Sequence, residues 1–469
     1  MKKILLYILL PILFINFILL TSCTQKYTVS FYDYDGRLLK EVKIELFEEV
    51  TPPEDPSREG YVFLGWDTSL INISKDTIVF AKYIEITKGI KYELSSDGTY
   101  YIVKGIEADK DNGTNIYIEE EYNALPVKEI APAAFYFSGI VSIYLPDNIT
   151  KIGDGAFRQS RELKKVRLGE NVEEIGIGAF DNCGYLNTIN LPNSLKKIGS
   201  GAFNWCYSLN EIDIPNSVVE LGKNAFANCG NLKNVTLSNK LTKIPNSCFL
   251  NCRSLQSINI PNSVLHIEEK AFYDCSSLQS ITLSNQLIEI SNDVFWYCIS
   301  LESVKMPNTL TIIGNNAFYG CAALKEVILS NQLTEIPYHC FQYCTKLESI
   351  VIPDSVTTIK SNAFNTCYSL KEVIFSKNLK TIETGAFQEC SSIESTLYLD
   401  NIQNIGSCAF SDCSKLREIY ISDSIKYIDY FAFYGSNNLT VYFELASEPN
   451  NWNDDWNFDG AKIVWGYKK

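Results

Sequence analysis

The sequence predicts a mostly β solenoid with short helical turns, built from about 14 coils and preceded by a small domain of strands. The first observation behind this prediction is a period in phenylalanine, whose first gap is 22 residues and whose later gaps are all 23. The second is a set of apolar positions at fixed distances from each phenylalanine. The third is composition, because 46% hydrophobic and 20% charged residues are typical of a folded chain. The periodic phenylalanines are Phe135, Phe157, Phe180, Phe203, Phe226, Phe249, Phe272, Phe295, Phe318, Phe341, Phe364, Phe387, Phe410 and Phe433.

Composition also excludes several classes of function. A chain of 469 residues is too long for one compact core and would ordinarily form roughly two or three domains. A formal net charge of −14 repels phosphate backbones, so we do not expect nucleic acid as a partner. His266 and His339 are the only histidines, which leaves little material for histidine-based catalysis or metal ligation. We therefore expect no catalytic residues, no metal and no cofactor.

The first 22 residues are typical of an export signal. Lys2 and Lys3 precede an apolar run over 4–20, and small residues then lead to Cys23. The run L-T-S-C at 20–23 resembles the lipobox of bacterial lipoproteins, which implies a signal peptide over 1–22 and a lipid on Cys23. The chain would then touch the membrane only through this anchor and lie exposed in the cell envelope. The alternative is an uncleaved transmembrane anchor, and both interpretations export the rest of the chain.

Residues 27–83 predict a small domain of short strands. Val29 and Phe31 alternate before Asp35-Gly36, which favours a hairpin. The motif G-Y-x-F-x-G-W at 60–66 and the closing V-F-A-K-Y at 79–83 resemble the Listeria–Bacteroides repeat, also called the internalin B-repeat. That resemblance implies a β-grasp-like module. Phe63 and Trp66 could contact a ligand, but in so small a domain we favour a core role.

Each 23-residue unit predicts one coil of the solenoid, as in the unit at 208–226. Apolar residues lie 6, 9, 11, 15, 18 and 22 positions after the preceding phenylalanine. Ile212 and Ile214 alternate as in a strand, so Asp213 between them points to the opposite face. The A-F-x-x-C stretch suits a short helical turn. A single coil buries too little apolar surface to offset its conformational entropy, so neighbouring coils must stack.

The pattern L-x-x-I-x-I-P-x-S-V-x-x-I-x-x-x-A-F-x-x-C resembles the BspA-type leucine-rich repeat, whose members are surface proteins. The resemblance implies repeats over 135–436, an N-terminal cap over 89–134 and a C-terminal cap over 437–469. A second period of 46 residues lies above the first and indicates duplication in pairs of coils. Proline follows the strand at Pro215, Pro261, Pro307 and Pro353, and serine takes its place in the intervening coils at Ser238, Ser284, Ser330 and Ser376.

Cysteine recurs three residues after the repeat phenylalanine in eleven coils. Disulfides are conceivable in an exported protein, but equivalent thiols in a ladder offer no preferred pairing, so we favour a reduced, buried row. Metal binding is disfavoured because no C-x-x-C pair is present. The eleven are Cys183, Cys206, Cys229, Cys252, Cys275, Cys298, Cys321, Cys344, Cys367, Cys390 and Cys413; Cys248, Cys340 and Cys408 are additional.

Three other groups of residues are candidate functional sites. His339 beside Cys340 invites a nucleophile–base pair, but adjacent side chains rarely face each other, and Cys340 replaces a core alanine. The acidic residues over 107–121 match a calcium loop only loosely, so a solvated cap loop is preferred. Trp452, Trp456 and Trp465 could form a glycan platform, although packing within the cap is favoured.

The outward strand position, ten residues after the phenylalanine, carries the strongest local signal. It is polar for seven coils, from Arg167 to Lys305, and then apolar or aromatic for five. In a solenoid these side chains line up into one exposed stripe that either binds a partner or reflects β-propensity alone. The segment at 393–399 departs from the pattern, so a bulge is expected to re-aim Tyr398. The partner-binding candidates are Ile328, Val351, Ile374, Tyr398 and Tyr420.

Export, a repeated surface and the lack of an active-site pattern together favour a surface-anchored adhesin or recognition protein. The resemblance to BspA-type proteins implies host extracellular-matrix or cell-surface proteins as partners. The alternative is a glycan-binding surface lipoprotein of a nutrient-uptake system, to which the tryptophan-rich C-terminal segment lends some support. A self-associating scaffold is a third possibility.

Overall fold

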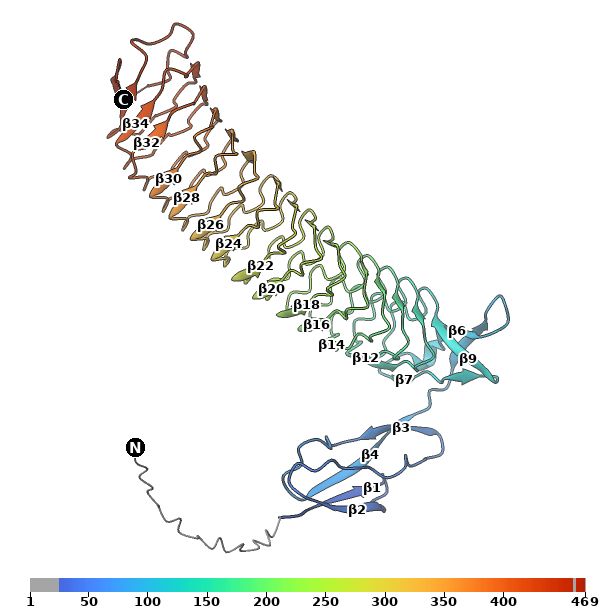
Figure 1. The fold of residues 1–469 in the computed structure, drawn as a ribbon. Coiled ribbons are helices and arrows are strands. Elements are labelled where there is room, and N and C mark those ends of the chain that lie inside the picture. The colour runs from blue at the N-terminus through green and yellow to red at the C-terminus, as the bar shows by residue number, and fades with distance from the viewer. Residues whose placement is uncertain (1–24, 459–460, 469) are drawn as a thin grey trace, which may run out of the picture. The chain divides into compact units, whose positions relative to one another are not determined.

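The computed structural model describes residues 25–458 and 461–468, and it divides the chain into two compact units, with the boundary between Ile86 and Thr87. The predicted signal peptide and Cys23 lie outside the described residues. Among the described residues no helix has the length and hydropathy of a bilayer span. Figure 1 shows the two units as a small sheet and a long stack of coils.

The first unit is a four-stranded mixed sheet in the order β2-β1-β4-β3. The predicted hairpin forms from β1 (Tyr27–Tyr32) and β2 (Leu38–Ile44), with Gly36 in the left-handed region at φ 82°. Strand β4 (Thr77–Glu85) lies parallel to β1 and antiparallel to β3 (Tyr61–Trp66).

Trp66 of the small sheet belongs to its core, as the sequence favoured. Its ring packs edge-on against the buried Phe31 at 4.9 Å and against Phe63 at 5.2 Å between centroids. Phe63 also contacts Tyr83 at 5.8 Å. The aromatic residues of the repeat motif therefore stabilise this sheet, since edge-on aromatic pairs add to the free energy of burial.

The second unit is the predicted solenoid, and it has about 16 turns (Figure 1). It begins with a hairpin of β5 (Ile90–Leu94) and β6 (Tyr101–Ile106), followed by the short 3-10 helix η1 (Ala108–Lys110). Strand β8 (Glu121–Tyr122) then pairs with β9 (Leu125–Ile130). The 14 coils predicted from the phenylalanines form, and strands in the two caps continue the stack.

Each coil contributes a short strand to a first strand row. The row consists of β7 (Asn115–Tyr117), β10 (Ser142–Tyr144), β12 (Lys165–Arg167), β14 (Thr188–Ile189), β16 (Glu211–Asp213), β18 (Asn234–Thr236), β20 (Ser257–Asn259), β22 (Ser280–Thr282), β24 (Ser303–Lys305), β26 (Glu326–Ile328), β28 (Ser349–Val351), β30 (Glu372–Ile374), β32 (Leu397–Leu399), β34 (Glu418–Ile421), β36 (Thr440–Phe443) and β37 (Lys462–Val464). Within it β16–β18, β20–β22, β24–β26 and β28–β30 form separate two-stranded sheets. These pairs follow the 46-residue period, so the coils are paired in the structure as well as in the sequence.

A second strand row covers another face of the stack. It consists of β9 (Leu125–Ile130), β11 (Lys151–Ile152), β13 (Glu174–Ile175), β15 (Lys197–Ile198), β17 (Glu220–Leu221), β19 (Lys243–Ile244), β21 (His266–Ile267), β23 (Glu289–Ile290), β25 (Ile312–Ile313), β27 (Glu335–Ile336), β29 (Thr358–Ile359), β31 (Thr381–Ile382), β33 (Asn404–Ile405) and β35 (Tyr427–Ile428). The strands pair in parallel, and equivalent residues of neighbouring coils lie opposite one another, as in Ile152↔Ile175.

The predicted helical turn around each repeat phenylalanine forms as consecutive hydrogen-bonded turns rather than as a helix. We call this stretch, from two residues before to two residues after the phenylalanine, the turn row. Gly155 and Gln159 flank Phe157 with φ of 60° and 61°, and a left-handed residue on each side cannot continue a right-handed helix. The N–H groups of Gly155, Phe157 and Gln159 instead donate to carbonyls of the next coil at 2.7 Å.

The repeat phenylalanines form one continuous stack through the core. Their side chains are at most 2% exposed, and successive rings lie nearly parallel with centroids between 5.0 Å and 6.0 Å apart. Leu, Ile, Val, Ala and Cys at the other repeat positions belong to the same buried cluster. The core therefore runs unbroken along the solenoid, which is the in-register packing that the 23-residue period predicts.

The C-terminal cap closes the end of this core. Trp452 and Trp456 are 6% and 3% exposed, and Phe433 packs edge-on against Trp456. Backbone N–H groups of Phe431 and Ala432 donate to carbonyls of Asp455 and Trp456. The cap thus satisfies turn-row donors that the last coil would otherwise expose.

Replacing Phe318 by alanine should lower the free energy of unfolding by about 3–5 kcal/mol, because it opens a cavity between the rings of Phe295 and Phe341. Denaturant unfolding followed by circular dichroism measures the change. Phe137 is 67% exposed, and its alanine variant, the matched control, should lose less than about 0.5 kcal/mol. Equal losses in the two variants would contradict a stabilising role for the stack.

Candidate binding surface

The outward position of the first strand row places the five sequence candidates on one exposed face. Ile328, Val351 and Ile374 are 46%, 57% and 50% exposed at the ends of β26, β28 and β30. Their inward neighbours are buried, as the alternation of a strand requires. Val351 lies opposite Ile374 in the paired strands. We call the row Ile328, Val351, Ile374, Tyr398, Tyr420 and Tyr442 the apolar stripe.

The C-terminal part of the apolar stripe is a ladder of stacked tyrosines. Tyr398 and Tyr420 stack at 5.2 Å, and Tyr420 and Tyr442 stack at 4.6 Å between ring centroids. The ring of Tyr467, from the C-terminal cap, contacts this ladder at a tilt, with its centroid 4.9 Å from that of Tyr420. Partial desolvation and the nearby Glu418 carboxylate raise the pKa of Tyr420, so its phenol stays protonated at neutral pH.

The expectation that a bulge re-aims Tyr398 is wrong. Tyr398 lies in register with Tyr420, and Leu397 and Leu399 on either side of it are buried. The additional residue is accommodated in the loop before β32, where the N–H of Ser395 donates to the carbonyl of Lys371. The ladder is therefore continuous through the irregular coil.

Sequence analysis missed Tyr442 and Tyr467. Ten residues after Phe433 stands Phe443, which is buried, because this coil is one residue shorter between the phenylalanine and its strand. Matching the alternation of T-V-Y-F at 440–443 to E-I-Y-I at 418–421 would have identified Tyr442. No comparable signal marks Tyr467, which reaches the ladder only through the fold of the cap.

An open hollow adjoins the tyrosine ladder. It has a volume of about 560 Å³, and Ile374, Tyr398 and Tyr467 supply its apolar wall. Lys377 and Asp400 line its polar side. The hollow can accept a side chain that is apolar along its length and charged at its end.

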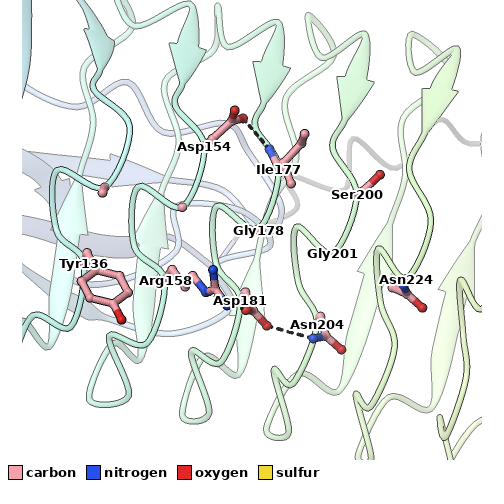
Figure 2. A pocket seen from close by; sticks show the side chains of 12 residues that line it. Tyr136, Asp154, Arg158, Ile177, Gly178, Asp181, Ser200, Gly201, Asn204 and Asn224 are labelled. Atoms are coloured by element: carbon pink, nitrogen blue, oxygen red, sulfur yellow. Dashed lines mark hydrogen bonds and ion pairs between the residues drawn. The ribbon is translucent and has the colours of Figure 1, made fainter.

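A larger groove of about 740 Å³ follows the turn row of the first coils (Figure 2). Gly155, Gly178 and Gly201, which carry no side chains, line its floor together with Asp154 and Asp181 of the same coils. Several of its polar groups form hydrogen bonds with each other or with the backbone. Asp154 accepts a hydrogen bond from the N–H of Ile177 at 2.7 Å, and Asp181 accepts one from Nδ2 of Asn204 at 2.9 Å. These bonds tie neighbouring coils together, so the polar groups of the groove serve coil stacking.

A second aromatic cluster lies one and two residues after the phenylalanines of the central coils. Trp296 stacks on Tyr319 at 4.0 Å and lies 5.9 Å from Tyr273. Tyr297 and Tyr343 beside them are 45% and 41% exposed. Sequence analysis missed this cluster because it compared the coils only at the outward strand position. Comparing the residue that follows each phenylalanine would have identified the cluster.

The thiol row is buried. All fourteen cysteines of the described residues are free, and all except Cys408 are buried. Each thiol of the repeat row donates to a phenylalanine carbonyl 26 residues earlier, as Cys229 does to Phe203 at 3.1 Å. Burial raises the pKa of Cys229 to about 12, so the thiol is neutral and weakly nucleophilic. The reduced row that the sequence favoured is the form present in this structure.

The other constellations do not form sites within the described residues. Nδ1 of His339 contacts Oε1 of Gln342 at 2.6 Å, while Cys340 is buried in the core, so the two do not pair. No three potential metal ligands gather in the part of the chain that the structure describes. Trp452 and Trp456 are core residues of the cap, so they form no exposed glycan platform.

Comparison with known proteins agrees with this architecture. A family model described as the BspA type leucine rich repeat region matches residues 128–256, 242–367 and 334–455, and the Listeria-Bacteroides repeat domain matches 27–82. A leucine-rich repeat protein from Bacteroides ovatus is 27% identical, with a TM-score of 0.71 over 81% of this chain and 99% of its own.

Two further similarities are more limited. A leucine rich cell surface protein from Faecalibacterium prausnitzii is also 27% identical, with a TM-score of 0.43 over 66% of this chain and 92% of its own. A protein of Evansella cellulosilytica that is named as a membrane protein is 33% identical over 79 residues, which are 15% of this chain and 12% of that relative. This chain therefore matches only a small part of the curated relative's length.

In the folded chain N-ethylmaleimide should modify Cys408 well before the buried thiols. Raising the pH from about 7.5 to about 9 should still leave the buried thiols unmodified. The pKa of a buried thiol such as Cys229 is raised, so its thiolate fraction stays small in that window. Mass spectrometry of tryptic peptides measures labelling, with the denatured chain as the control. Rapid native labelling of Cys229 or Cys344 would show that the core opens readily.

Proposed function

Because the chain belongs to the BspA-type leucine-rich repeat family, we propose that it is a surface-anchored adhesin or recognition protein that binds host matrix proteins or other cells through the apolar stripe. The observation that carries this proposal is the row of exposed Ile, Val and Tyr side chains on a rigid face. Exposed apolar rows of this kind on soluble proteins are typical of partner sites.

The geometry of the stripe supports binding of a protein rather than chemistry. Its side chains lie on paired strands, so they are held in place before a partner arrives and lose little conformational entropy on binding. Tyrosine is among the residues that contribute most at protein interfaces. The stripe contains no histidine, thiol or carboxylate of its own that could act as a nucleophile or base.

The glycan-binding alternative has weaker support. The tryptophans that suggested it are buried in the cap. In the tyrosine ladder the rings stack against one another, so their faces are largely covered while their edges face solvent. Sugar rings bind aromatic faces, so a ladder that presents edges suits a protein partner better.

The sequence over 1–23 supports anchoring at the cell surface. A charged start, an apolar run and L-T-S-C at 20–23 favour lipidation of Cys23 after export. The similarity to a protein named as a membrane protein is compatible with this location. The anchor and the repeat surface together fit a protein that presents a recognition surface outside the cell.

Changing Ile328, Val351 and Ile374 together to glutamate should weaken binding of the chain 24–469 to a matrix protein at least about tenfold, since interface positions of this kind contribute about 1 kcal/mol or more each. Surface plasmon resonance against a panel of matrix proteins and glycans measures it. The same outward row tolerates charge at Asp213 and Lys305, so the variant should fold.

The matched control places the same three charges on the polar part of that row, at Thr236, Asn259 and Thr282. This control should bind as the parent chain does. Equal binding by both variants would remove the stripe as the partner site, and binding only to glycans would favour the alternative function.

Substituting Cys23 by serine should release the chain from the membrane fraction, because the diacylglycerol that anchors a lipoprotein is attached to the cysteine thiol. Fractionation and metabolic labelling with a fatty acid, in a host that processes lipoproteins, measure this. Ser22→Thr, which keeps the cysteine, is the control. A Cys23→Ser chain that stays with the membrane without a label would indicate an uncleaved transmembrane anchor.

A further inference from the structure

A row of carboxylates runs beside the apolar stripe on the same outward face. Glu326, Glu372 and Glu418 stand two residues before Ile328, Ile374 and Tyr420, so both rows point away from the core. They occur in every second coil, which places neighbouring carboxylates about 10 Å apart. We call these three residues the carboxylate row.

The opposite edge of the stripe is also acidic. Asp354, Asp400, Asp423 and Glu444 follow the strands of successive coils. Asp400 lines the hollow of about 560 Å³ beside Tyr398, and Glu444 lies with Tyr420 and Tyr467 in the adjoining recess. Lys377 interrupts this edge with one positive charge. The apolar stripe is therefore bordered by negative charge on both sides.

The carboxylate row differs from its neighbours in forming no ion pair within the part of the chain that the structure describes. In the alternate coils, glutamates stand one repeat position earlier. These glutamates, Glu302, Glu348 and Glu394, each form an ion pair with a lysine, at 3.3 Å, 3.4 Å and 3.0 Å. In contrast, Glu326 and Glu372 form no ion pair among the described residues. Charge that the fold does not neutralise remains available to a partner.

This combination is confined to the C-terminal part of the solenoid. In the coils before it the same two outward rows carry polar or charged residues, such as Asn234 with Thr236 and Glu211 with Asp213, so the carboxylate of Glu211 has no apolar neighbour in the second row. Carboxylates and apolar side chains thus appear together, where β-propensity alone would change only one of the two rows.

We infer that the apolar stripe binds a cationic, amphipathic segment of a partner protein, whose apolar side chains pack on Ile328, Val351 and Ile374 while its Arg or Lys side chains reach the carboxylate row. This inference rests on the proposed function, in which the stripe is the partner site. The tyrosine ladder contributes as well, since its hydroxyl groups can accept hydrogen bonds from guanidinium or ammonium groups.

Charge complementarity selects this occupant over the others. A second copy of the chain would bring the same carboxylates into the interface, and the whole chain carries −14. Nucleic acid and an anionic lipid surface are repelled for the same reason. Burying the carboxylates against an apolar neutral segment would cost their hydration without compensation.

The probe is a synthetic amphipathic peptide of about 18 residues, roughly 27 Å long as a helix, with leucine on one face and arginine on the other. A matched peptide carries glutamate in place of arginine. Fluorescence anisotropy measures the binding of both to the chain 24–469, at low and at high salt. We expect the arginine peptide to bind, the glutamate peptide to fail, and high salt to weaken binding.

The decisive variant changes Glu326, Glu372 and Glu418 to glutamine, which removes charge and keeps shape. It should weaken binding of the arginine peptide about 3- to 150-fold, the combined effect of three exposed charge pairs. The matched control changes Glu302, Glu348 and Glu394 to glutamine in neighbouring coils and should weaken it less than about twofold. Equal effects of the two variants, or equal binding of the two peptides, would overturn the inference.

A third variant separates this inference from the proposed function. The third variant changes Ile328, Val351 and Ile374 to threonine, which the same row carries at Thr236 and Thr282. It should weaken binding of the arginine peptide and of the matrix protein alike. If matrix binding depends on the stripe but the peptides show no charge preference, the inference is wrong and the function stands. If neither ligand responds to the threonine variant, the stripe is not the partner site.

Discussion

The in-register stacking of the repeat phenylalanines is the interaction on which the rest of the solenoid depends. Each ring lies within 5.0–6.0 Å of the next, and turn-row N–H groups such as that of Phe157 bind the following coil at 2.7 Å. A shift of one residue in any coil would break these bonds and turn inward side chains outward. The 23-residue period is therefore a geometric requirement of the stack.

The register of the core also determines what the surface displays. Because each coil repeats the last, one sequence position becomes one line of side chains, and small differences between coils accumulate into a patterned face. The apolar stripe and the carboxylate row arise in this way, two residues apart on the same strands. The pairing of coils adds a second period of two coils to this surface, since the carboxylates recur in alternate coils while the apolar residues recur in every one.

Much of this organisation was predictable from sequence because local and long-range patterns coincide in a repeat. The phenylalanine and cysteine rows, the strand alternation and the five outward candidates all follow from counting residues. Counting failed where a coil changes length. It predicted a re-aimed Tyr398 and missed Tyr442, because loops before β32 and β36 absorb the difference in ways that depend on packing.

The sequence by itself determined that the chain forms a solenoid, which side chains point inward or outward, and which residues form the core, since these depend on periodicity and burial alone. Only the tertiary structure decided that the turn around each phenylalanine is not helical, that Trp452 and Trp456 close the core, and that Tyr467 joins the ladder. It also decided which carboxylates are neutralised, because the pairing of Glu302 with Lys325 depends on the distance between side chains of neighbouring coils. Those distances are set by coil-to-coil contacts that no single repeat contains.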